Sequence, residues 1–332
     1  MNSIAQRLAT LTIGQPARHR NLALFPLIGA RAGLLEYMTL DEALTTGLIR
    51  IAEDGVAGRV SEVSVENDAA VPVLLIEGEE LVGCRQNRVI NVSILVPPKS
   101  ELVVPVSCVE QGRWNPTSAA FESSGHAQLS KGPANKVTSV SASLAAGMGY
   151  HSDQAAVWAG IRDKAEALQM ATATMAMADI YSHACSSLAD FERCLSKSKG
   201  AVGGIFCIGE SAIGIDLFDQ PSSWTKYRPK LLKGYALDAL DALRQPFDQT
   251  PISACAFFER LRIAQFDVRP SLGIGEDLRA DQPDITAAAL VSEDTVVHLC
   301  GFPQERDVNP TQSIHSRILR RQAHFGRTAA SE

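Results

Sequence analysis

The sequence lacks the features that mark a membrane-embedded, exported or disulfide-stabilised protein. Its most apolar runs, such as Val71–Ile76, stop after six residues, whereas a membrane-spanning helix needs about 20. Residues 1–14 have neither a positively charged start followed by an apolar core nor a small-residue cleavage site, so we predict no signal peptide. The seven cysteines are scattered and form no CxxC pair, which argues against a disulfide framework or a structural zinc site. These absences predict a cytoplasmic protein.

An excess of positive charge is also missing. The formal net charge is -6, which argues against a surface built to neutralise phosphates, so nucleic acid is not the expected partner, although a local basic groove is allowed. Gly200-Ala-Val-Gly-Gly204 has neither the lysine nor the spacing of a P-loop. The 332 residues, 45% hydrophobic, suffice for one large domain or two. A homo-oligomer is compatible with this composition, and no cofactor is identified.

A strand is expected at 21–28, and Thr39-Leu-Asp-Glu42 provides the cap of a short helix that ends at Gly47. Short β-branched runs separated by turn residues follow, at 48–52, 60–65, 71–76, 89–95 and 102–109. Because no room remains for crossover helices, we predict an antiparallel sandwich or curled sheet. Helical periodicity follows at 155–169 and 174–195, then a hairpin at 201–218 and helices near 226–243 and 253–263. The last strands, 265–272 and 287–300, contain a hairpin turn at 291–296. The fold class is therefore α+β.

Four segments are expected. Residues 1–114 form the β-rich part, and residues 115–151, rich in Ser, Gly and Asn, form a long loop or lid, since loops of that length are uncommon unless functional. Residues 152–303 supply helices and hairpins packed on the sheet, in one compact domain with 1–114. Residues 304–332 are a basic, disordered tail.

The densest polar cluster inside apolar surroundings is Glu77-Gly-Glu-Glu-Leu-Val-Gly-Cys-Arg-Gln-Asn-Arg88, directly after the apolar run 71–76. Unpaired charges cost several kcal/mol to bury, so these side chains must be solvated, paired with one another, or hold a ligand. Strand alternation places Asn91 and Ser93 on one face. The same alternation places Cys108 and Glu110 on a shared face of the next strand, roughly 7 Å apart.

These residue types allow more than one chemistry. Cys108 is a candidate nucleophile, although no histidine lies near it in sequence and His126 or His151 would have to fold back. Glu80 and Glu110 can divide general-acid and general-base roles, as in hydrolysis of glycosidic bonds. Arginines suit anionic groups, and Trp114 can stack on a base. The alternative for the whole cluster is a structural salt-bridge network. The candidate ligand-binding residues are Glu79, Arg85, Gln86, Arg88, Asn91, Arg113 and Trp114.

The segments 77–91, 95–98 and 104–114 resemble the ARG and rhodanese-phosphatase-superfamily-associated protein domain, and the similarity continues to about residue 245. That family is named for gene association with ADP-ribosylglycohydrolase and rhodanese-phosphatase proteins. The resemblance implies a prokaryotic protein that works near ADP-ribose or other nucleotide-derived metabolites. It also implies a site at Glu79, Glu80, Gln86, Asn91, Cys108, Glu110, Arg113 and Trp114. Here Cys84-Arg85 stands where the family pattern has Ala-Lys.

Three functions follow as hypotheses. The first is a site that binds, or binds and hydrolyses, an anionic nucleotide-derived or ADP-ribose-like molecule, with Glu80 and Glu110 moving protons and arginines holding anionic groups. The second is a non-catalytic sensor or scaffold that recognises a partner protein through the β face. The third is a metal-dependent hydrolase, with a metal held by Glu79, Glu80, Cys108, Glu110 and His151.

Overall fold

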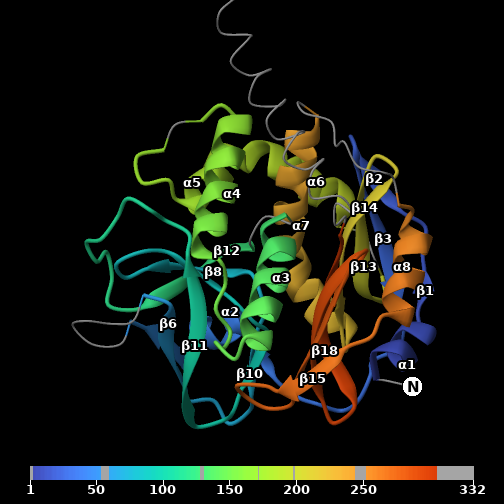
Figure 1. The fold of residues 1–332 in the computed structure, drawn as a ribbon, viewed down its shortest axis with the longest axis horizontal. Coiled ribbons are helices and arrows are strands. Elements are labelled where there is room, and N and C mark those ends of the chain that lie inside the picture. The colour runs from blue at the N-terminus through green and yellow to red at the C-terminus, as the bar shows by residue number, and fades with distance from the viewer. Residues whose placement is uncertain are drawn as a thin grey trace, which may run out of the picture.

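The computed structural model of the chain describes residues 3–53, 60–127, 131–170, 172–196, 199–243 and 252–304. Over these residues it contains eight helices and eighteen strands, which confirms the α+β class. Two β regions lie on either side of a layer of helices (Figure 1). The predicted tail, 304–332, lies outside the described residues except for Gln304.

The larger β region is one nine-stranded sheet with antiparallel pairing throughout. The predicted hairpin at 201–218 and the turn at 291–296 are both part of it, and the latter turn places Glu293 and Asp294 at φ of 48° and 61°. Its strands run in the order β1 (Thr12–Ile13), β3 (Leu22–Ile28), β13 (Ala201–Ile208), β14 (Ser211–Phe218), β18 (Thr295–Pro303), β17 (Ile285–Ser292), β16 (Glu276–Gln282) and β15 (Asp267–Pro270), with β2 (Ala17–His19) paired to β3.

The smaller β region contains the polar motif. Its six-stranded sheet has the order β12 (Phe121–Ala127), β8 (Glu79–Gly83), β9 (Arg88–Ile90), β11 (Ser100–Cys108), β6 (Glu62–Asn67) and β5 (Ile49–Ala52). A three-stranded sheet of β10 (Ile94–Val96), β7 (Val73–Leu75) and β4 (Met38–Thr39) adjoins it. The predicted antiparallel pairing holds except between β4 and β7, which are parallel. The run 89–95, predicted as one strand, is divided between β9 and β10, which belong to different sheets.

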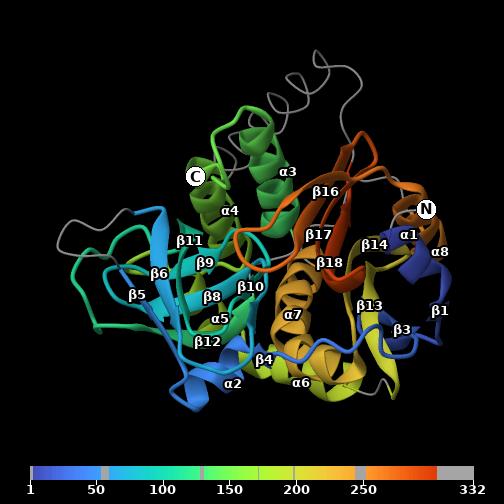
Figure 2. The ribbon, with the colours of Figure 1, turned by 90° about the horizontal axis from the view of Figure 1, so that it is seen from below.

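Helices fill the space between the two β regions. The longest, α7 (Pro221–Ala242), packs against both β12 and β13, so it connects one region to the other (Figure 2). Helix α3 (Lys131–Ala145) contacts β16 and β17, and α4 (Gln154–Ala167) contacts β11. Also in this layer are α5 (Met177–His183) and α6 (Cys185–Leu195), predicted as a single helix. Helices α1 (Ser3–Ala9) and α8 (Ala254–Ile263) pack on the large sheet, and α2 (Leu40–Thr45) begins with the predicted Thr39 cap.

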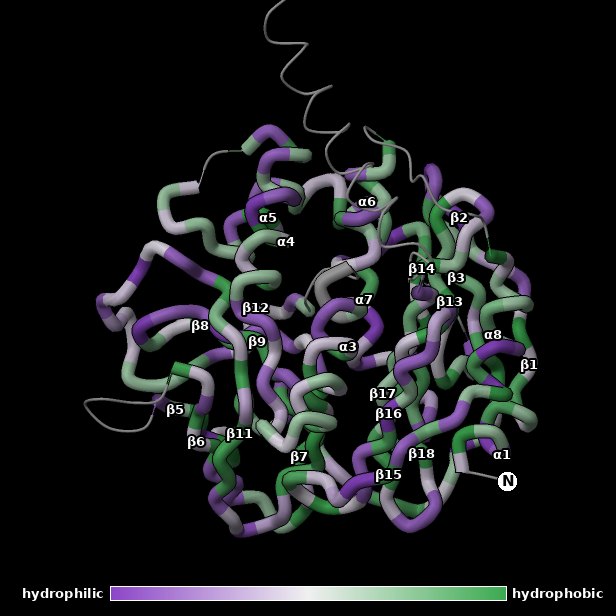
Figure 3. The backbone as a smooth tube through the Cα atoms, viewed as in Figure 1, coloured by the Kyte–Doolittle hydropathy of each residue, from purple (hydrophilic) through white to green (hydrophobic). Residues whose placement is uncertain are grey.

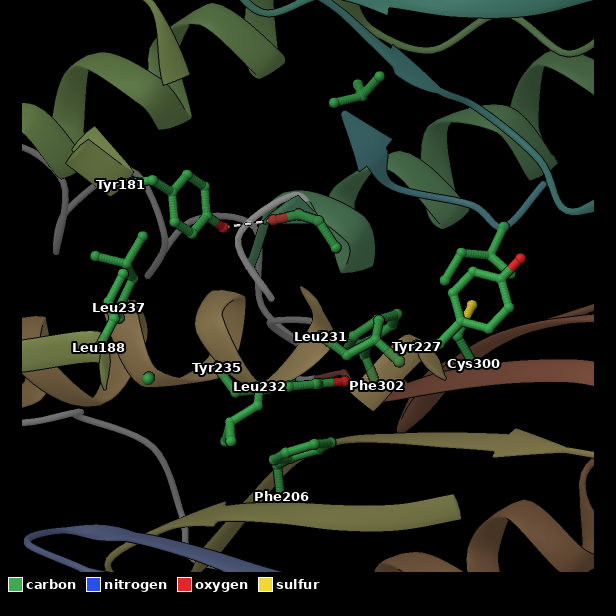
Figure 4. Packing of buried hydrophobic residues seen from close by; sticks show 14 of the residues in the cluster. Tyr181, Leu188, Phe206, Tyr227, Leu231, Leu232, Tyr235, Leu237, Cys300 and Phe302 are labelled. Atoms are coloured by element: carbon green, nitrogen blue, oxygen red, sulfur yellow. Dashed lines mark hydrogen bonds between the residues drawn. The ribbon is translucent and has the colours of Figure 1, made fainter. Parts of the chain in front are cut away.

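The apolar interior falls into three clusters that follow this layering. One joins the helical layer to both β regions, one lies between the large sheet and α1 and α8, and one lies inside the smaller β region. In the first, Leu232 and Tyr235 of α7 lie over Phe206 of β13, with the Phe206 and Tyr235 rings stacked at 3.8 Å (Figure 4). Hydrophobic stretches run along the strands of both β regions, whereas β8 is hydrophilic in part (Figure 3).

The structure of residues 115–151 differs from the prediction made from the sequence. They were expected to form a long loop, but they contain β12 and helix α3. The Ser, Gly and Asn content hid both elements, because the apolar residues that bury them are few and widely spaced: Phe121, Ala127, Val137 and Val140. Over the described residues, none of the helices combines the length and apolar character that crossing a membrane requires.

Candidate functional site

The polar motif forms a turn, strand β8, a second turn and strand β9. Gly78 takes φ of 88° and its amide donates to the carbonyl of Ile90 (2.9 Å), which opens the first turn. Gly83 takes φ of 126°, and a Cβ there would meet the Ser118 hydroxyl at 2.4 Å, so both turns require glycine. These two turns set the ends of β8, and the strand between them directs successive side chains to opposite faces of the sheet.

Glu79 is buried and fully paired. Its Oε1 lies 2.7 Å from Nζ of Lys230 on α7, and its Oε2 accepts from the amide of Ile76 (2.8 Å). Lys230 also donates to Asp41 (2.6 Å) and Ser123 (3.1 Å). Although burial disfavours its charge, Glu79 and Asp41 raise the pKa of Lys230. This ion pair connects β8 to α7, which indicates a structural role for Glu79.

Glu80 is buried but accepts no hydrogen bond from any of the described residues. Its side chain is fully shielded from solvent, and both carboxylate oxygens lack a donor there. The imidazole of His126 on β12 lies close by, with Nδ1 3.7 Å from Oε2, beyond hydrogen-bond distance. The imidazole is 20% exposed and stacks on the Tyr181 ring at 4.2 Å and 6°. A buried carboxylate therefore lies behind a solvent-accessible imidazole.

Tyr181 completes this arrangement. Its hydroxyl donates to the carbonyl of Ala127, next to His126 (Figure 4). Burial, and to a lesser extent the Glu80 carboxylate, raises the pKa of Tyr181 well above its ordinary value, so the phenol stays neutral. On the other side, Lys233 of α7 donates from Nζ to the carbonyl of Gly125 (3.3 Å). The side chains of Lys233, Tyr181 and Glu80 thus lie around the Gly125–Ala127 segment, which carries the His126 imidazole.

Arg88 and Gln86 form a second group on the other face of the smaller sheet. Arg88 donates to Gln86 Oε1 (3.1 Å) and to Glu53 Oε1 (3.1 Å), and Arg85 lies 3.8 Å from Glu53. Cys108 is opposite Arg88 in the strand register. Burial raises the pKa of the Cys108 thiol, with Arg88 opposing. The thiol is therefore protonated at neutral pH, which does not favour a nucleophilic role.

Glu110 and Arg113 form a fully bonded clamp between two loops. Arg113 Nε donates to both carboxylate oxygens (2.9 and 3.0 Å), and Nη2 lies 2.7 Å from Oε2. The guanidinium also donates to the carbonyls of Gly83 and Cys84, and Glu110 accepts from the amide of Asn87 (3.2 Å). These bonds agree with the alternative hypothesis of a structural salt-bridge network. Trp114 beside the clamp is 56% exposed.

Asn91 points toward the connection between α3 and α4. It accepts from Ser107 (2.6 Å) and donates to the carbonyl of Tyr150 (3.2 Å), and Ser107 is also bonded to Ser152. Gln154, at the start of α4, bonds both the amide (2.7 Å) and the carbonyl (2.8 Å) of Cys108. These contacts hold the α3–α4 connection against β11.

The candidate residues therefore divide into separate groups. The structure brings Gln86 to Arg88 and Glu110 to Arg113, whereas Glu80 and Glu110 have different neighbours and no interaction joins them among the described residues. Sequence reasoning missed Tyr181 and Lys233, and it mentioned His126 only as a partner for Cys108. The Ser-rich neighbourhood of His126 gave no signal that it lay on a strand beside β8. Over the described residues, no group of three His, Cys, Asp or Glu is placed to hold a metal.

A family model matches residues 10–302, over the β regions and the helical layer alike. It describes the ARG and Rhodanese-Phosphatase-superfamily-associated Protein domain. The chain belongs to this family. No curated protein and no solved structure gives a significant match. The membership confirms the resemblance seen in the sequence.

Proposed function

We propose that the protein binds and hydrolyses a nucleotide-derived, ADP-ribose-like molecule, with His126 as the general acid/base and Glu80 as the carboxylate that stabilises its charged form. The observation that carries the proposal is the Glu80 carboxylate, which is shielded from solvent, lacks a hydrogen-bond donor and lies 3.7 Å from an imidazole that solvent reaches. A buried acceptor without a partner is costly unless it serves chemistry or ligand binding.

The roles follow from the geometry of the pair. His126 is the group that reaches solvent, so it takes a proton from an attacking water and later returns it to the leaving group. Glu80 lies behind it and stabilises the imidazolium that forms, because opposite charges attract strongly where water is excluded. Tyr181 holds the imidazole plane by stacking. Lys233, bonded to the neighbouring carbonyl of Gly125, supplies a cation for an anionic substrate.

This assignment moves the anion-binding role away from the arginines. Arg88 and Arg113 are engaged by Glu53 and Glu110, so a phosphate would have to compete with a carboxylate at either residue. It also replaces Glu110 by His126 as the partner of Glu80. The substrate class rests on the gene association for which the family is named, and the Lys233 amine is a cation that suits an anionic ligand.

The test is hydrolysis of ADP-ribose and of ADP-ribose 1″-phosphate by the full chain, with products separated by ion-exchange chromatography. Glu80→Gln and His126→Asn should each lower kcat by roughly 10²-fold or more, since general acid–base groups contribute about that much. Glu122→Gln is the matched control, because Glu122 is exposed on β12 near His126. Unchanged turnover in Glu80→Gln, or no turnover by the parent protein, would contradict the proposal.

A scaffold function is the second candidate, and one observation favours it. Trp114 is 56% exposed beside the Glu110–Arg113 clamp, and exposed tryptophan is a frequent anchor of protein interfaces. A partner that binds through Trp114 should be lost from a pull-down with Trp114→Ala and kept with Glu80→Gln. Retention of every partner by Trp114→Ala would remove this candidate.

A further inference from the structure

The boundary between the smaller β region and the large sheet contains a second group of buried charges, which we call the interface centre. It consists of Glu77 before β8, Lys136 on α3, and Asp277 and Arg279 on β16. All four side chains are at least 95% buried. Helix α3 packs directly on β16, so three separate elements converge here (Figure 2).

Arg279 uses only part of its bonding capacity. Its Nε donates to Asp277 Oδ2 (2.8 Å), whereas Nη1 and Nη2 donate no hydrogen bond to any of the described residues. Nη2 forms an ion pair with Glu77 Oε2 at 3.7 Å, which is too long for a hydrogen bond. The centre of the Tyr150 ring lies 5.8 Å from the guanidinium carbon. Two donor nitrogens of a buried guanidinium therefore lack an acceptor within hydrogen-bond distance, and one of them lies close to the Glu77 carboxylate.

Glu77 is the complementary half. Neither of its carboxylate oxygens accepts a hydrogen bond, although the side chain is only 1% exposed. Its backbone is held in place, because the amide donates to Ser93 Oγ (2.9 Å), which is bonded in turn to His298 Nδ1 (2.8 Å). The carboxylate is thus positioned by its surroundings but left without a donor.

The interface centre contains two carboxyl groups, Glu77 and Asp277, and two cations, Arg279 and Lys136. Burial raises the pKa of Glu77, with Lys136 and Arg279 opposing. Burial lowers the pKa of Lys136 to about 8, with Glu77 opposing, so the amine is still mainly protonated at pH 7. A phosphate or carboxylate offers only acceptors, so it would leave the Glu77 oxygens without a donor and would add a negative charge beside them. An occupant of this centre is therefore uncharged and carries hydrogen-bond donors.

We propose that the interface centre binds an uncharged small molecule that carries two adjacent hydroxyl groups. Each hydroxyl is both a donor and an acceptor. Two neighbouring hydroxyls can donate to Oε1 and Oε2 of Glu77 and accept from Nη1 and Nη2 of Arg279, which satisfies all four unpaired atoms at once. A single hydroxyl satisfies half of them. The vicinal diol of a sugar has this chemistry.

Tyr150 marks the side from which the centre can be reached. Its residue is partly exposed, it lies over Arg279, and its hydroxyl donates to the carbonyl of Pro270 (3.2 Å). It follows Gly147 and Gly149, at φ of 72° and 81°, in the short connection after α3. This centre is distinct from the Glu80–His126 pair in its neighbours, and the inference does not rest on the proposed hydrolysis.

The test is ligand-observed NMR titration of the full chain with methyl β-D-ribofuranoside, which has a 2,3-diol. Its 2-deoxy analogue, which has no adjacent hydroxyls, is the comparison. We expect the riboside to bind roughly tenfold or more tightly than the deoxy analogue, since each lost bond to a charged group weakens binding by about that factor. Glu77→Gln should weaken riboside binding by a similar factor. Glu276→Gln, at the exposed end of β16, should not change it.

Absence of saturable riboside binding would overturn the proposal, as would equal affinities for the two ribosides. The comparison of the two ligands uses the parent protein alone, so it stands even if a variant folds poorly. Because neither probe is a nucleotide, failure here leaves the hydrolysis proposal intact, and failure of hydrolysis leaves this one intact.

Discussion

Glu80 and Glu110 are both buried, yet their surroundings are opposite. Glu110 accepts from Arg113 and from the amide of Asn87, whereas Glu80 accepts from no donor among the described residues. Bonded carboxylates of this kind hold loops together and stabilise the fold. A carboxylate left without donors destabilises the fold and persists when it serves another purpose. The difference motivates the structural role that we expect for Glu110 and the functional role that we propose for Glu80.

The largest effect is expected where a fully paired buried charge loses its partner. Lys164 of α4 lies 2.7 Å from both Asp238 and Asp241 of α7 and is 5% exposed. Lys164→Met should lower the free energy of unfolding by about 3–5 kcal/mol, because Asp238 is left buried without its cation. Urea unfolding measures this loss. Lys226→Met is the matched control, since Lys226 is 43% exposed on α7, and equal stability of the two variants would contradict the assignment.

Asp219 has a carboxylate of which only one oxygen is hydrogen-bonded, so it lies between the two cases. One of its oxygens accepts from Tyr37 and the other has no partner, and burial raises its pKa to about 6. A folded pKa above the unfolded value of 3.8 means that folding favours the protonated form. This contribution is complete below pH of about 4 and is lost as pH rises through about 6.

Asp219→Asn, which mimics the protonated form, should therefore stabilise the fold by up to about 3 kcal/mol at pH 8. The gain should vanish below pH of about 4, where the parent carboxyl is already protonated. Denaturant unfolding of the variant and the parent protein at pH 4, 6 and 8 measures how this stability difference depends on pH. A loss of stability of the same size at all three values would show that the carboxylate is needed for its bonds instead.

Glu110→Gln should destabilise the protein by about 1–3 kcal/mol, because the amide cannot accept both bonds from the guanidinium. Thermal unfolding at fixed pH detects the change. Glu101→Gln is a suitable control, since Glu101 is exposed and accepts a hydrogen bond from the Ser64 hydroxyl. An unaltered melting temperature in Glu110→Gln would place Glu110 among the functional charges.

The smallest effect is expected at Cys108. Because burial raises its pKa, the thiol should resist alkylation by iodoacetamide at pH 7.5 while the exposed Cys185, Cys194 and Cys255 react. Peptide mass spectrometry identifies the modified positions. Cys108→Ala should keep the hydrolytic rate of the parent protein, and loss of turnover in that variant would restore Cys108 as a nucleophile.

Local sequence signals predicted the parts of the fold that depend on local physics. Alternation predicted that Asn91 and Ser93 share a face, and both side chains bond to groups outside the smaller β region, Tyr150 and His298. The hairpin at 201–218 and the Thr39 cap lie where the sequence predicted them. The division of 89–95 between two sheets depends on distant partners, β7 and β11, which no local pattern reveals.

The candidate site could be predicted only in part, because its geometry also depends on residues that are distant in the sequence. The motif marked Glu79, Glu80 and Glu110 as unusual, but their roles are set by Lys230, His126 and Arg113, and two of these lie in segments without a motif. Glu77 and Arg279 are about 200 positions apart in sequence and meet only because β16 lies against the smaller β region. Long-range pairing of this kind determines the surroundings of these charged groups.

The most direct test compares Glu80→Gln with Glu110→Gln for both unfolding free energy and hydrolysis of ADP-ribose. We predict that Glu80→Gln loses turnover while its stability is unchanged or higher, and that Glu110→Gln loses stability while the folded fraction keeps its turnover. Loss of stability in Glu80→Gln with turnover preserved per folded molecule would contradict the account.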